Sequence, residues 1–258
     1  MNAIHQAIEA KFTTNQKVVL GVSGGMDSCV LLHALYTRSI PCIVAHVNYT
    51  MRGKDSDEDA QFVEHLAKSY GFPFVLREVH GKALKLSGNF QDIARQTRYN
   101  FFKEVVNNHK AHWIATAHHL DDQAETMLLK LFGGSTIKGL AGMAPLDDNH
   151  CRPLLHIPRA DLLAYAEHYG LSWREDISNS SLEYDRNHLR HEILPSLRER
   201  HPRWFNGIAQ QSDKLRKWSA FAEDRAKQLI AKKIETHRGQ ELLNLPWIES
   251  CLLYTSPS

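Results

Sequence analysis

Short apolar runs alternate with amphipathic segments through the first half of the chain, and no other feature constrains the fold as strongly. Four runs are short and rich in Val, Ile and Phe, which predicts strands buried on both faces. They cover residues 17–22, 41–47, 72–79 and 112–119. Segments with apolar residues at helical spacing lie at 27–39, 55–71, 87–108 and 121–132. This alternation implies right-handed crossovers and an α/β fold, with a parallel doubly wound sheet covered by helices.

The segments that follow are less regular. A fifth strand is predicted at 151–157, after a glycine-rich connector at 132–145 whose length indicates a functional loop. A helix is predicted from about residue 158 to 169, since proline is tolerated in a first helical turn. Polar residues at helical spacing from 205 to 235 predict one long helix that leads out of the α/β domain.

The chain is therefore expected to have three parts. Residues 1–200 form the α/β domain, and residues 201–249 form a helical linker and the start of a further region. The last residues, 250–258, resemble translated sequencing-adapter sequence. We expect this tail to be non-native and a C-terminal region to be missing.

Composition argues against several classes of protein. No apolar run approaches the roughly 18 residues of a membrane span, and the first residues lack the basic start and apolar core of a secretory signal. The cysteines form no Cys-x-x-Cys pair, which disfavours zinc ribbons, thioredoxin-like sites and cysteine-held iron–sulfur clusters. They are Cys29, Cys42, Cys151 and Cys251. Reduced thiols of a cytoplasmic protein are the expected state.

Charge is balanced overall but uneven along the chain. The formal net charge is +2, whereas eight Lys or Arg residues face three acidic ones between Arg186 and Lys217. Such a run is usually a solvated face, but beside a nucleotide site it is a candidate for phosphate contacts.

The hexapeptide Ser-Gly-Gly-Met-Asp-Ser at 23–28 joins the first predicted strand to the first predicted helix. Its glycines lack a Cβ, so backbone N–H groups can approach an oxyanion, and the following helix directs its positive end to the same place. The serines add hydroxyl groups, and the Asp27 carboxylate beside bound phosphate suits Mg²⁺. A glycine turn with Asp or Ser as N-cap would explain a lone glycine pair but not the whole hexapeptide. The predicted anion site is Ser23, Gly24, Gly25, Met26, Asp27 and Ser28.

Two familiar phosphate loops do not fit, because Gly-x-x-x-x-Gly-Lys-Ser/Thr is absent and no Gly-x-Gly-x-x-Gly follows the first strand. The hexapeptide instead resembles the signature of the PP-loop ATP pyrophosphatases. Members release pyrophosphate from ATP and transfer AMP to a substrate oxygen, and a nucleophile then attacks the carbon that bears this oxygen. The resemblance implies ATP and Mg²⁺ as cofactors, with pyrophosphate in the loop and Asp27 as the metal ligand.

The segment AHHLDDQAET carries a second group of polar side chains. His118, Asp122 and Glu125 are spaced i, i+4 and i+7, so in a helix they would share one face, beside a strand end where parallel sheets bind ligands. Two carboxylates there suit an amine substrate, and His118 could contact phosphate or transfer protons near neutral pH. A His118–Asp122 metal pair has no evident third ligand, and acidic enrichment at a helix N-terminus is the simpler alternative.

Five segments, in order, resemble the tRNA(Ile)-lysidine synthases, and the resemblance covers most of residues 17–200. The segments are 45–63, 94–102, 116–143, 152–179 and 184–195. The resemblance implies a Rossmann-like, adenine nucleotide alpha hydrolase-like fold, followed by the start of a tRNA-binding region. It also implies a lysine site at Asp122 and Glu125, with His118 close by.

Other residues have roles implied by the same resemblance. Arg98 is expected to contact ATP phosphates or tRNA, whereas Arg95, one turn away, fits an ordinary amphipathic helix. The strand end from His46 to Asn48 should line the adenosine pocket. Family members often carry a second histidine where this chain has Tyr49, so no role is assigned to that side chain.

Arg186 and Arg190 are spaced i, i+4, and either could reach the active site or lie on a basic surface. The predicted catalytic residues are Asp27, His118, Asp122, Arg186 and Arg190. The predicted ATP-binding residues are those of the anion site together with His46, Asn48 and Arg98.

The resemblance implies a ligase that modifies the wobble cytidine of tRNA(Ile) with a CAU anticodon to lysidine. ATP adenylates the C2 oxygen of the base and releases pyrophosphate, and L-lysine then attacks and releases AMP. The expected partners are this tRNA and L-lysine, with no membrane, in the cytoplasm. A homodimer is compatible, since family members are commonly dimers.

Three alternatives stay open. A tRNA thiolase of the same superfamily would need sulfur-handling cysteines, usually paired, and none are paired in this sequence. Amide-forming relatives such as the GMP or NAD synthetases have motifs of their own that are absent. A non-catalytic nucleotide-binding module would not need Asp27 together with His118 and its neighbouring carboxylates.

Overall fold

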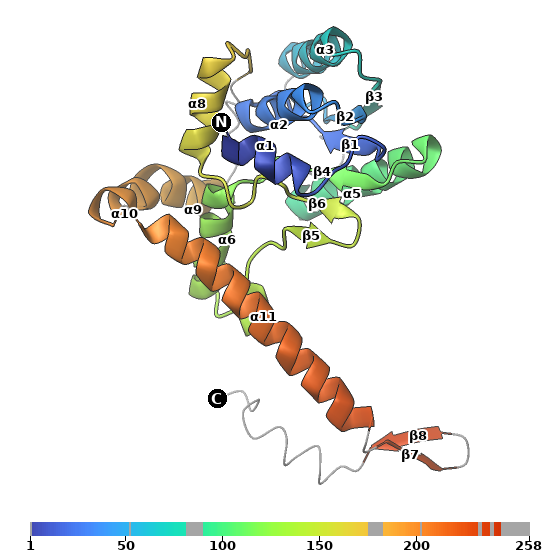
Figure 1. The fold of residues 1–258 in the computed structure, drawn as a ribbon, viewed down its shortest axis with the longest axis vertical. Helices are drawn as coiled ribbons and strands as arrows, with labels where there is room; N and C mark the ends of the chain where they lie inside the picture. The colour runs from blue at the N-terminus through green and yellow to red at the C-terminus, as the bar shows by residue number, and fades with distance from the viewer. Residues whose placement is uncertain are drawn as a thin grey trace.

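Six strands of the described chain form the central sheet, and the loop at 23–28 leaves it from a middle strand. In the computed structural model the described residues are 2–51, 53–80, 90–174, 183–201, 203–231, 234–237 and 240–243. Across the sheet the strands follow the order β3 (Phe74–Glu78), β2 (Cys42–Asn48), β1 (Val18–Gly21), β4 (Trp113–Ala115), β6 (His150–Cys151) and β5 (Leu146–Asp147) (Figure 1). All neighbours pair in parallel except β5, which is antiparallel to β6.

Helices cover both faces of this sheet, and each face has its own core. On one face lie α1 (Asn2–Glu9), α2 (Met26–Thr37), α3 (Lys54–Ser69) and α8 (Arg159–His168), and on the other lies α5 (Phe90–His109). Val18 and Leu20 of β1 belong to the first core, whereas Val19 between them packs with α5. Side chains alternate along a strand, so burial on both faces explains the continuous apolar runs.

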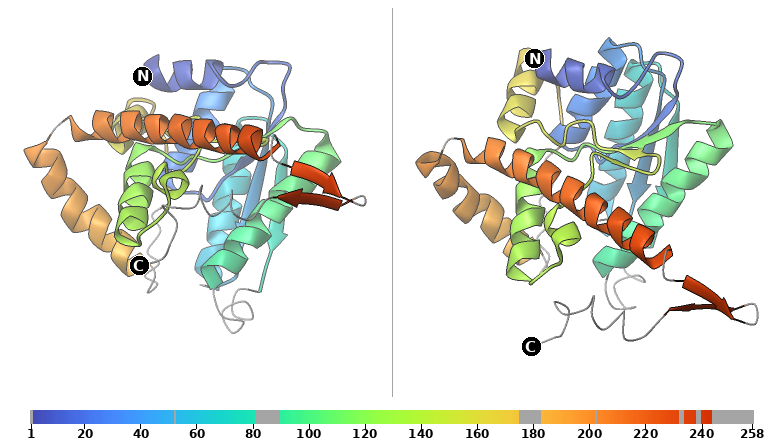
Figure 2. Two further views of the ribbon diagram at one scale, coloured as in Figure 1. Left: turned by 90° about the horizontal axis from the view of Figure 1, so that it is seen from below. Right: turned by 60° about the horizontal axis from the view of Figure 1, so that its bottom comes forward.

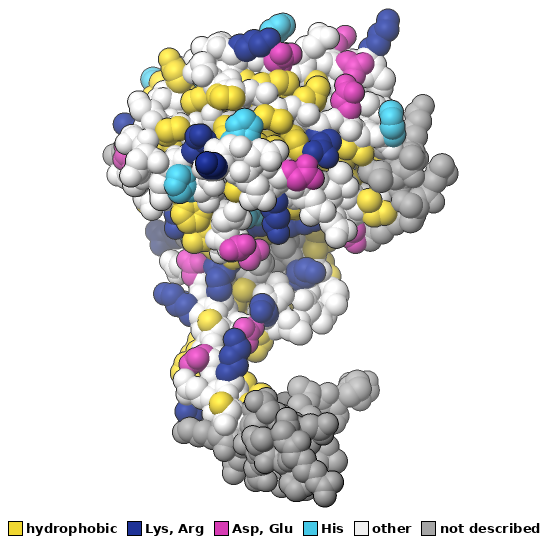
Figure 3. Space-filling view, turned by 90° about the vertical axis from the view of Figure 1, so that its right-hand side faces the viewer, with side chains coloured by type: hydrophobic (Ala, Val, Ile, Leu, Met, Phe, Trp, Pro, Cys, Tyr) yellow, Lys and Arg dark blue, Asp and Glu magenta, His cyan; other side chains and the backbone are white. Residues whose placement is uncertain are grey.

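The remaining elements gather around a helix beyond the sheet. They are α6 (Leu120–Phe132), α7 (Ile137–Leu140), α9 (Glu183–His188), a π-helical turn (Leu189–Ile193), α10 (Leu194–Arg200), α11 (Trp204–Ala231), β7 (Ile234–His237) and β8 (Gln240–Leu243). Leu120 and Ala124 of α6 form a small core with Leu194 and Phe205. From there α11 runs away from the sheet to the β7–β8 hairpin, as two further views show (Figure 2). Charged side chains are spread along this part of the molecule (Figure 3).

Gly21 ends β1 where α5 approaches the sheet. A Cβ at this position would lie 2.5 Å from Cζ of Phe102, a distance that real Cβ atoms do not show. The glycine therefore lets α5 pack closely beneath the loop at 23–28.

Most predicted elements are confirmed, with ends shifted by a few residues. Residues 87–89 of the helix predicted at 87–108 lie outside the described residues. The predicted strand at 151–157 is wrong beyond Cys151, because Pro153 has no N–H to donate and the amides of Leu155 and Ile157 close consecutive turns. The connector at 132–145 contains α7 and leads directly into β5, neither of which was predicted.

The C-terminal elements differ from the prediction in one respect. The long helix ends at Ala231, and Ile234 already begins β7, so the predicted helix to 235 is too long. The predicted tail at 250–258 lies outside the described residues, and the predicted division at residue 200 stays a prediction. In the part of the chain that the structure describes, no helix is long and apolar enough to cross a membrane.

Candidate active site

The hexapeptide at 23–28 forms a tight loop between β1 and α2. Gly24 has a φ of +94°, which L side chains rarely adopt, and Gly25 is the N-cap of α2 without a capping side chain. The Ser28 hydroxyl donates to the Gly25 carbonyl at 2.8 Å, and the Ser23 hydroxyl oxygen accepts from the Gly25 N–H at 3.2 Å. Since neither Asp nor Ser caps α2, the N–H groups of its first turn can bind an oxyanion.

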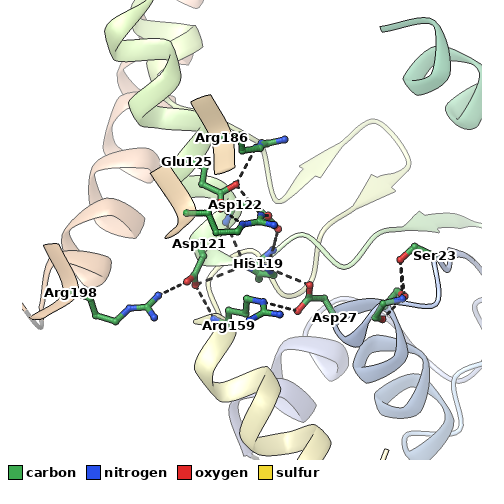
Figure 4. Close-up of polar contacts among 12 residues, drawn as sticks. Ser23, Asp27, His119, Asp121, Asp122, Glu125, Arg159, Arg186 and Arg198 are labelled. Atoms are coloured by element: carbon green, nitrogen blue, oxygen red, sulfur yellow. Dashed lines mark hydrogen bonds and ion pairs between the residues drawn. The ribbon is translucent and has the colours of Figure 1, made fainter. Parts of the chain in front are cut away.

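Asp27 lies in that first turn, after the buried Met26, and its carboxylate faces α6 and α8 (Figure 4). Its Oδ2 lies 3.5 Å from Nε2 of His119, and its Oδ1 lies 3.8 Å from Nε of Arg159. Burial opposes ionisation of Asp27, but the hydrogen bond with His119 and the nearby positive charges outweigh it and lower the pKa of Asp27. The carboxylate is therefore ionised.

One oxygen of this carboxylate fits a metal ion. Oδ1 of Asp27 is buried and has no hydrogen-bond partner, so it is available to a hard cation such as Mg²⁺. Within the described residues, no group of three His, Cys, Asp or Glu side chains could hold a metal. Mg²⁺ usually takes one or two carboxylates together with phosphate oxygens and water, which suits a single carboxylate beside an oxyanion loop.

His119 is a site residue that sequence reasoning missed. As the N-cap of α6, its Nδ1 accepts from the Asp122 N–H at 3.4 Å, while Oδ2 of Asp122 accepts from the His119 N–H at 3.0 Å. The ring is only 2% exposed, and its other nitrogen faces Asp27. Burial would lower the pKa of His119, but Asp27 and the neighbouring carboxylates raise it. Histidine is not a preferred N-cap residue, and the approach of Asp27 depends on the tertiary fold, so no sequence signal identified His119.

Asp121 holds three elements together next to His119. Its Oδ2 accepts from the Arg159 N–H at the start of α8 at 2.9 Å, and its Oδ1 pairs with Arg198 of α10 (Figure 4). From the sequence alone Asp121 has no role of its own, since it only adds to the acidic enrichment at a helix N-terminus. Because the bond fixes the first turn of α8, it holds the Arg159 side chain opposite Asp27.

A chain of hydrogen bonds orients His118. Arg152 can only donate, so Nδ1 of His150, 3.0 Å away, accepts and neutral His150 carries its proton on Nε2. That N–H donates to the Thr116 hydroxyl at 2.8 Å, and the hydroxyl donates to Nδ1 of His118 at 2.9 Å. Burial and the charge of Arg152 lower the pKa of His150 to about 3 and also lower the pKa of His118. His118 is thus neutral and presents an Nε2–H donor.

Helix α6 begins at Leu120, so the helical face predicted for three residues holds only for Asp122 and Glu125, and His118 lies before the helix. Glu125 is completely buried, and its two oxygens accept from Nε and Nη2 of Arg190 at 2.7 and 3.0 Å. Arg186 lies 3.0 Å from the same carboxylate, and Arg190 also reaches Asp122 at 3.0 Å.

Both arginines therefore reach the predicted lysine site rather than a basic surface. They come from α9 and the π-helical turn, which bring residues beyond 183 across to α6 (Figure 4). Burial raises the pKa of Glu125, and the ion pair with Arg190 opposes that shift. A buried carboxylate of this kind depends on its arginine partners for ionisation.

The predicted residues of β2 lie at the same edge of the sheet, with their side chains engaged in the fold. The Nδ1–H of buried His46 donates to the Val22 carbonyl at 2.7 Å, just before the loop. The Asn48 amide donates to Asp57 at 2.9 Å, and its oxygen accepts from the Thr50 N–H at 2.8 Å. The backbone of this strand end is also engaged, since the Asn48 carbonyl accepts from the Val79 N–H at 2.8 Å.

Arg98 approaches from α5. Its guanidinium carbon lies 5.6 Å from the centroid of the Tyr99 ring. Besides burial, the charge of Arg98 contributes to the lowered pKa of His118, so it lies on the His118 side of the site.

A parallel sheet whose middle strand leads through an oxyanion loop into a helix, with polar side chains along the carboxyl edge, defines a nucleotide-binding α/β domain. More narrowly, the chain belongs to the PP-loop domain family, whose sequence profile matches residues 1–197.

Known proteins with similar sequences include two tRNA(Ile)-lysidine synthases. The chain is 37% identical over 245 residues to the tRNA(Ile)-lysidine synthase of Bacillus subtilis (strain 168), covering 89% of this chain and 52% of that protein. It is 39% identical over 213 residues to the enzyme of the same name from Geobacter sulfurreducens. That match covers 79% of this chain and 45% of the Geobacter protein. The chain thus spans about half the length of the curated relatives it matches.

A solved structure confirms the fold. The U34-tRNA thiolase NcsA from Methanococcus maripaludis superposes with a TM-score of 0.70 at 23% identity, over 84% of this chain and 78% of that one. At that identity the likeness concerns the fold alone.

Proposed function

We propose that the chain carries the catalytic site of an ATP-dependent ligase that converts the wobble cytidine of tRNA(Ile) with a CAU anticodon to lysidine. The similarity to tRNA(Ile)-lysidine synthases over most of the chain supports this activity. The observation that carries it is the contact between Asp27 and His119, which joins the oxyanion loop to the helix with Asp122 and Glu125.

ATP would bind with its terminal phosphates on the loop at 23–28 and the first turn of α2. The adenosine would lie over the end of β2, from His46 to Asn48, and Arg98 would contact phosphate from α5. Asp27 would hold Mg²⁺, which when bound offsets the negative charge of the departing pyrophosphate. The N–H groups at the start of α2, which no side chain caps, would stabilise the negative charge of the same pyrophosphate.

In the first step the C2 oxygen of the cytidine forms a bond to the α-phosphorus. The bond from this phosphorus to its bridging oxygen breaks, and pyrophosphate leaves. Because Thr116 accepts from His150 and donates to Nδ1 of His118, the Nε2–H of His118 is fixed as a donor toward oxygen. A neutral donor of this kind can stabilise negative charge as it develops without taking part in proton exchange.

In the second step the amine nitrogen of L-lysine forms a bond to C2, the C2–O bond breaks, and AMP leaves with the oxygen. The amine must be neutral when it attacks. Asp122 and Glu125 would orient lysine, sharing their oxygens with Arg190 and Arg186. The tRNA, the amino acid, a homodimeric state and a cytoplasmic location all belong to this proposal.

The runner-up, a tRNA thiolase, is disfavoured by the cysteines of the described chain. Cys29, Cys42 and Cys151 are buried, and burial raises the pKa of Cys29 to about 12 and that of Cys151 to about 11. Protonated, buried thiols are poor nucleophiles and poor metal ligands. Cys251 lies outside the described residues.

Incorporation of radiolabelled lysine into transcripts of tRNA(Ile) tests the proposal. We expect incorporation that requires ATP and disappears when the wobble cytidine is replaced by uridine. Transfer of sulfur in place of lysine would favour the thiolase, and ATP binding without either reaction would favour a non-catalytic module.

A further inference from the structure

A second group of cations lies at the carboxyl edge of the sheet, around Tyr99 and His150. The guanidinium carbons of Arg95 and Arg98 lie 5.0 and 5.6 Å from the centroid of the Tyr99 ring, whose own centroid is 5.0 Å from that of His150. Arg152, two residues after His150 in the chain, donates a hydrogen bond to the His150 ring. The arginine ion pairs of the described residues that lie nearby in the sequence are made by other arginines, among them Arg77 and Arg159.

Several donors in this cluster have no partner. Arg152 is only 4% exposed, yet its Nε makes no hydrogen bond, and the same holds for the buried Nε of Arg98 and the buried hydroxyl of Tyr99. Buried donors and buried cations without partners are unfavourable, and nearly all such groups in proteins are satisfied. An oxyanion would provide both the missing negative charge and several acceptor oxygens.

Apart from Arg98, which the proposed function assigns to an ATP phosphate, the cluster lies away from the loop at 23–28. Helix α5 runs antiparallel to the strands, so its first half lies at the carboxyl edge, where the Tyr49 hydroxyl donates to the Ala94 carbonyl at 2.7 Å. Arg152 directly follows β6, which lies two strands from β1, or about 10 Å at the usual strand spacing. The proposed adenosine position at β2 is on the other side of β1, so ATP on the loop extends away from Arg152.

We propose that Arg95 and the Tyr99 hydroxyl, with the charge of Arg152 behind them, bind a backbone phosphate of the RNA substrate next to the reacting base. This inference rests on the proposed function and names how the same site holds its polynucleotide. An arginine stacked over an aromatic ring keeps its N–H groups free for phosphate. A phosphate fixed here would place the neighbouring base beside His118, which the hydrogen bonds from Thr116 hold in position.

Fluorescence anisotropy with a labelled anticodon stem–loop RNA of loop sequence CAU tests this, with calorimetric titration of ATP·Mg²⁺ in parallel. Arg95→Gln removes one charge from the exposed side of α5, and Lys103→Gln, on the same helix and also exposed, is the matched control. We expect Arg95→Gln to weaken RNA binding about tenfold and to reduce the slope of log affinity against log salt by about 0.7–0.9. ATP affinity should stay within about twofold for both variants, and Lys103→Gln should leave RNA binding unchanged.

Tyr99→Phe tests whether the Tyr99 hydroxyl contacts the RNA or only supports the fold. The hydroxyl has no partner in the protein, so its removal should not destabilise the fold, but RNA binding should weaken several-fold. RNA affinity that is unchanged in both Arg95→Gln and Tyr99→Phe would overturn the inference, as would loss of ATP affinity instead of RNA affinity. If the wild-type chain binds ATP but no RNA, this inference fails and the ATP site stands, whereas binding of neither contradicts the proposed function itself.

Discussion

Nε2 of His119 lies 3.5 Å from Oδ2 of Asp27, and this contact joins two elements that are far apart in the sequence. Asp27 lies in the first turn of α2, within the oxyanion loop at 23–28, while His119 caps the helix that carries Asp122 and Glu125. One imidazole ring thus sets the position of the predicted phosphate site relative to the predicted lysine site.

Two replacements of His119 distinguish its role as the N-cap of α6 from its role in positioning Asp27. Asparagine is a good N-cap but too short to reach Asp27, so His119→Asn should leave α6 intact and lower the rate of pyrophosphate release about 10–100-fold. His119→Ala should lose the cap as well and cost about 1 kcal/mol more of unfolding free energy. Urea unfolding and steady-state pyrophosphate release measure the two effects. A wild-type rate in His119→Asn would show that the ring does not position Asp27.

The same pair predicts how stability depends on pH. The pKa of His119 is raised above 6.5, so its contribution is fully present below pH 6.5 and is lost as pH rises through the folded-state pKa. The pKa of Asp27 is lowered below 3.8, so its contribution is present above that value and is lost as pH falls through the folded-state pKa. The difference in unfolding free energy between wild type and His119→Asn should therefore be largest from pH 3.8 to 6.5. A difference that is constant across a pH series would show that the contact between His119 and Asp27 shifts neither pKa.

Arg190 should matter more for stability than Arg186, although both pair with Glu125. Arg190→Met removes two hydrogen bonds to a completely buried carboxylate and one to Asp122. Loss of one partner of a buried ion pair costs about 3–5 kcal/mol, and because Arg190 is 41% exposed we expect about 2–3 kcal/mol. Arg186→Met, which leaves the bidentate pair in place, should cost less than about 1 kcal/mol. Chemical denaturation measures the unfolding free energy of both variants. Equal losses of stability in the two would argue against the bidentate pair between Arg190 and Glu125.

Gly21 is predicted to tolerate no side chain. In Gly21→Ala the new methyl group would meet the Phe102 ring at 2.5 Å, so we expect a loss of about 2 kcal/mol of unfolding free energy. In a Phe102→Leu background the same alanine should cost less, which a double-mutant cycle measures. Gly207→Ala in α11 is the control: a Cβ there meets nothing within 4 Å, and helix propensity predicts a gain of up to about 1 kcal/mol. Equal effects in both Phe102 backgrounds would contradict the contact.

Features that depend on local sequence were predictable. The apolar runs around β1 to β4 indicate buried strands, and the whole hexapeptide at 23–28 between a buried strand and a helix indicates an oxyanion loop. Asp122 and Glu125 were placed on one helix face because they are three residues apart. His118 escaped that pattern because the helix begins one residue after the capping His119.

Features that depend on tertiary contacts were not predictable. Arg186 and Arg190 meet Glu125 only because α9 and the π-helical turn fold back onto α6, and nothing in their spacing identifies that partner. Arg152 resembled part of a strand, yet it turns inward to donate to His150 and the Ala144 carbonyl. Such contacts between distant segments fix the site, and residue periodicity contains no information about them.

The central claim is that this site transfers AMP from ATP to an RNA base, and ATP labelled at the α-phosphate tests it most directly. With the CAU transcript and no lysine, we predict that label moves onto the RNA while pyrophosphate is released, and that added lysine then releases the label as AMP. Asp27→Asn should reduce the transfer strongly while the fold is retained. Formation of ADP and phosphate, or label that never reaches the RNA, would contradict the account.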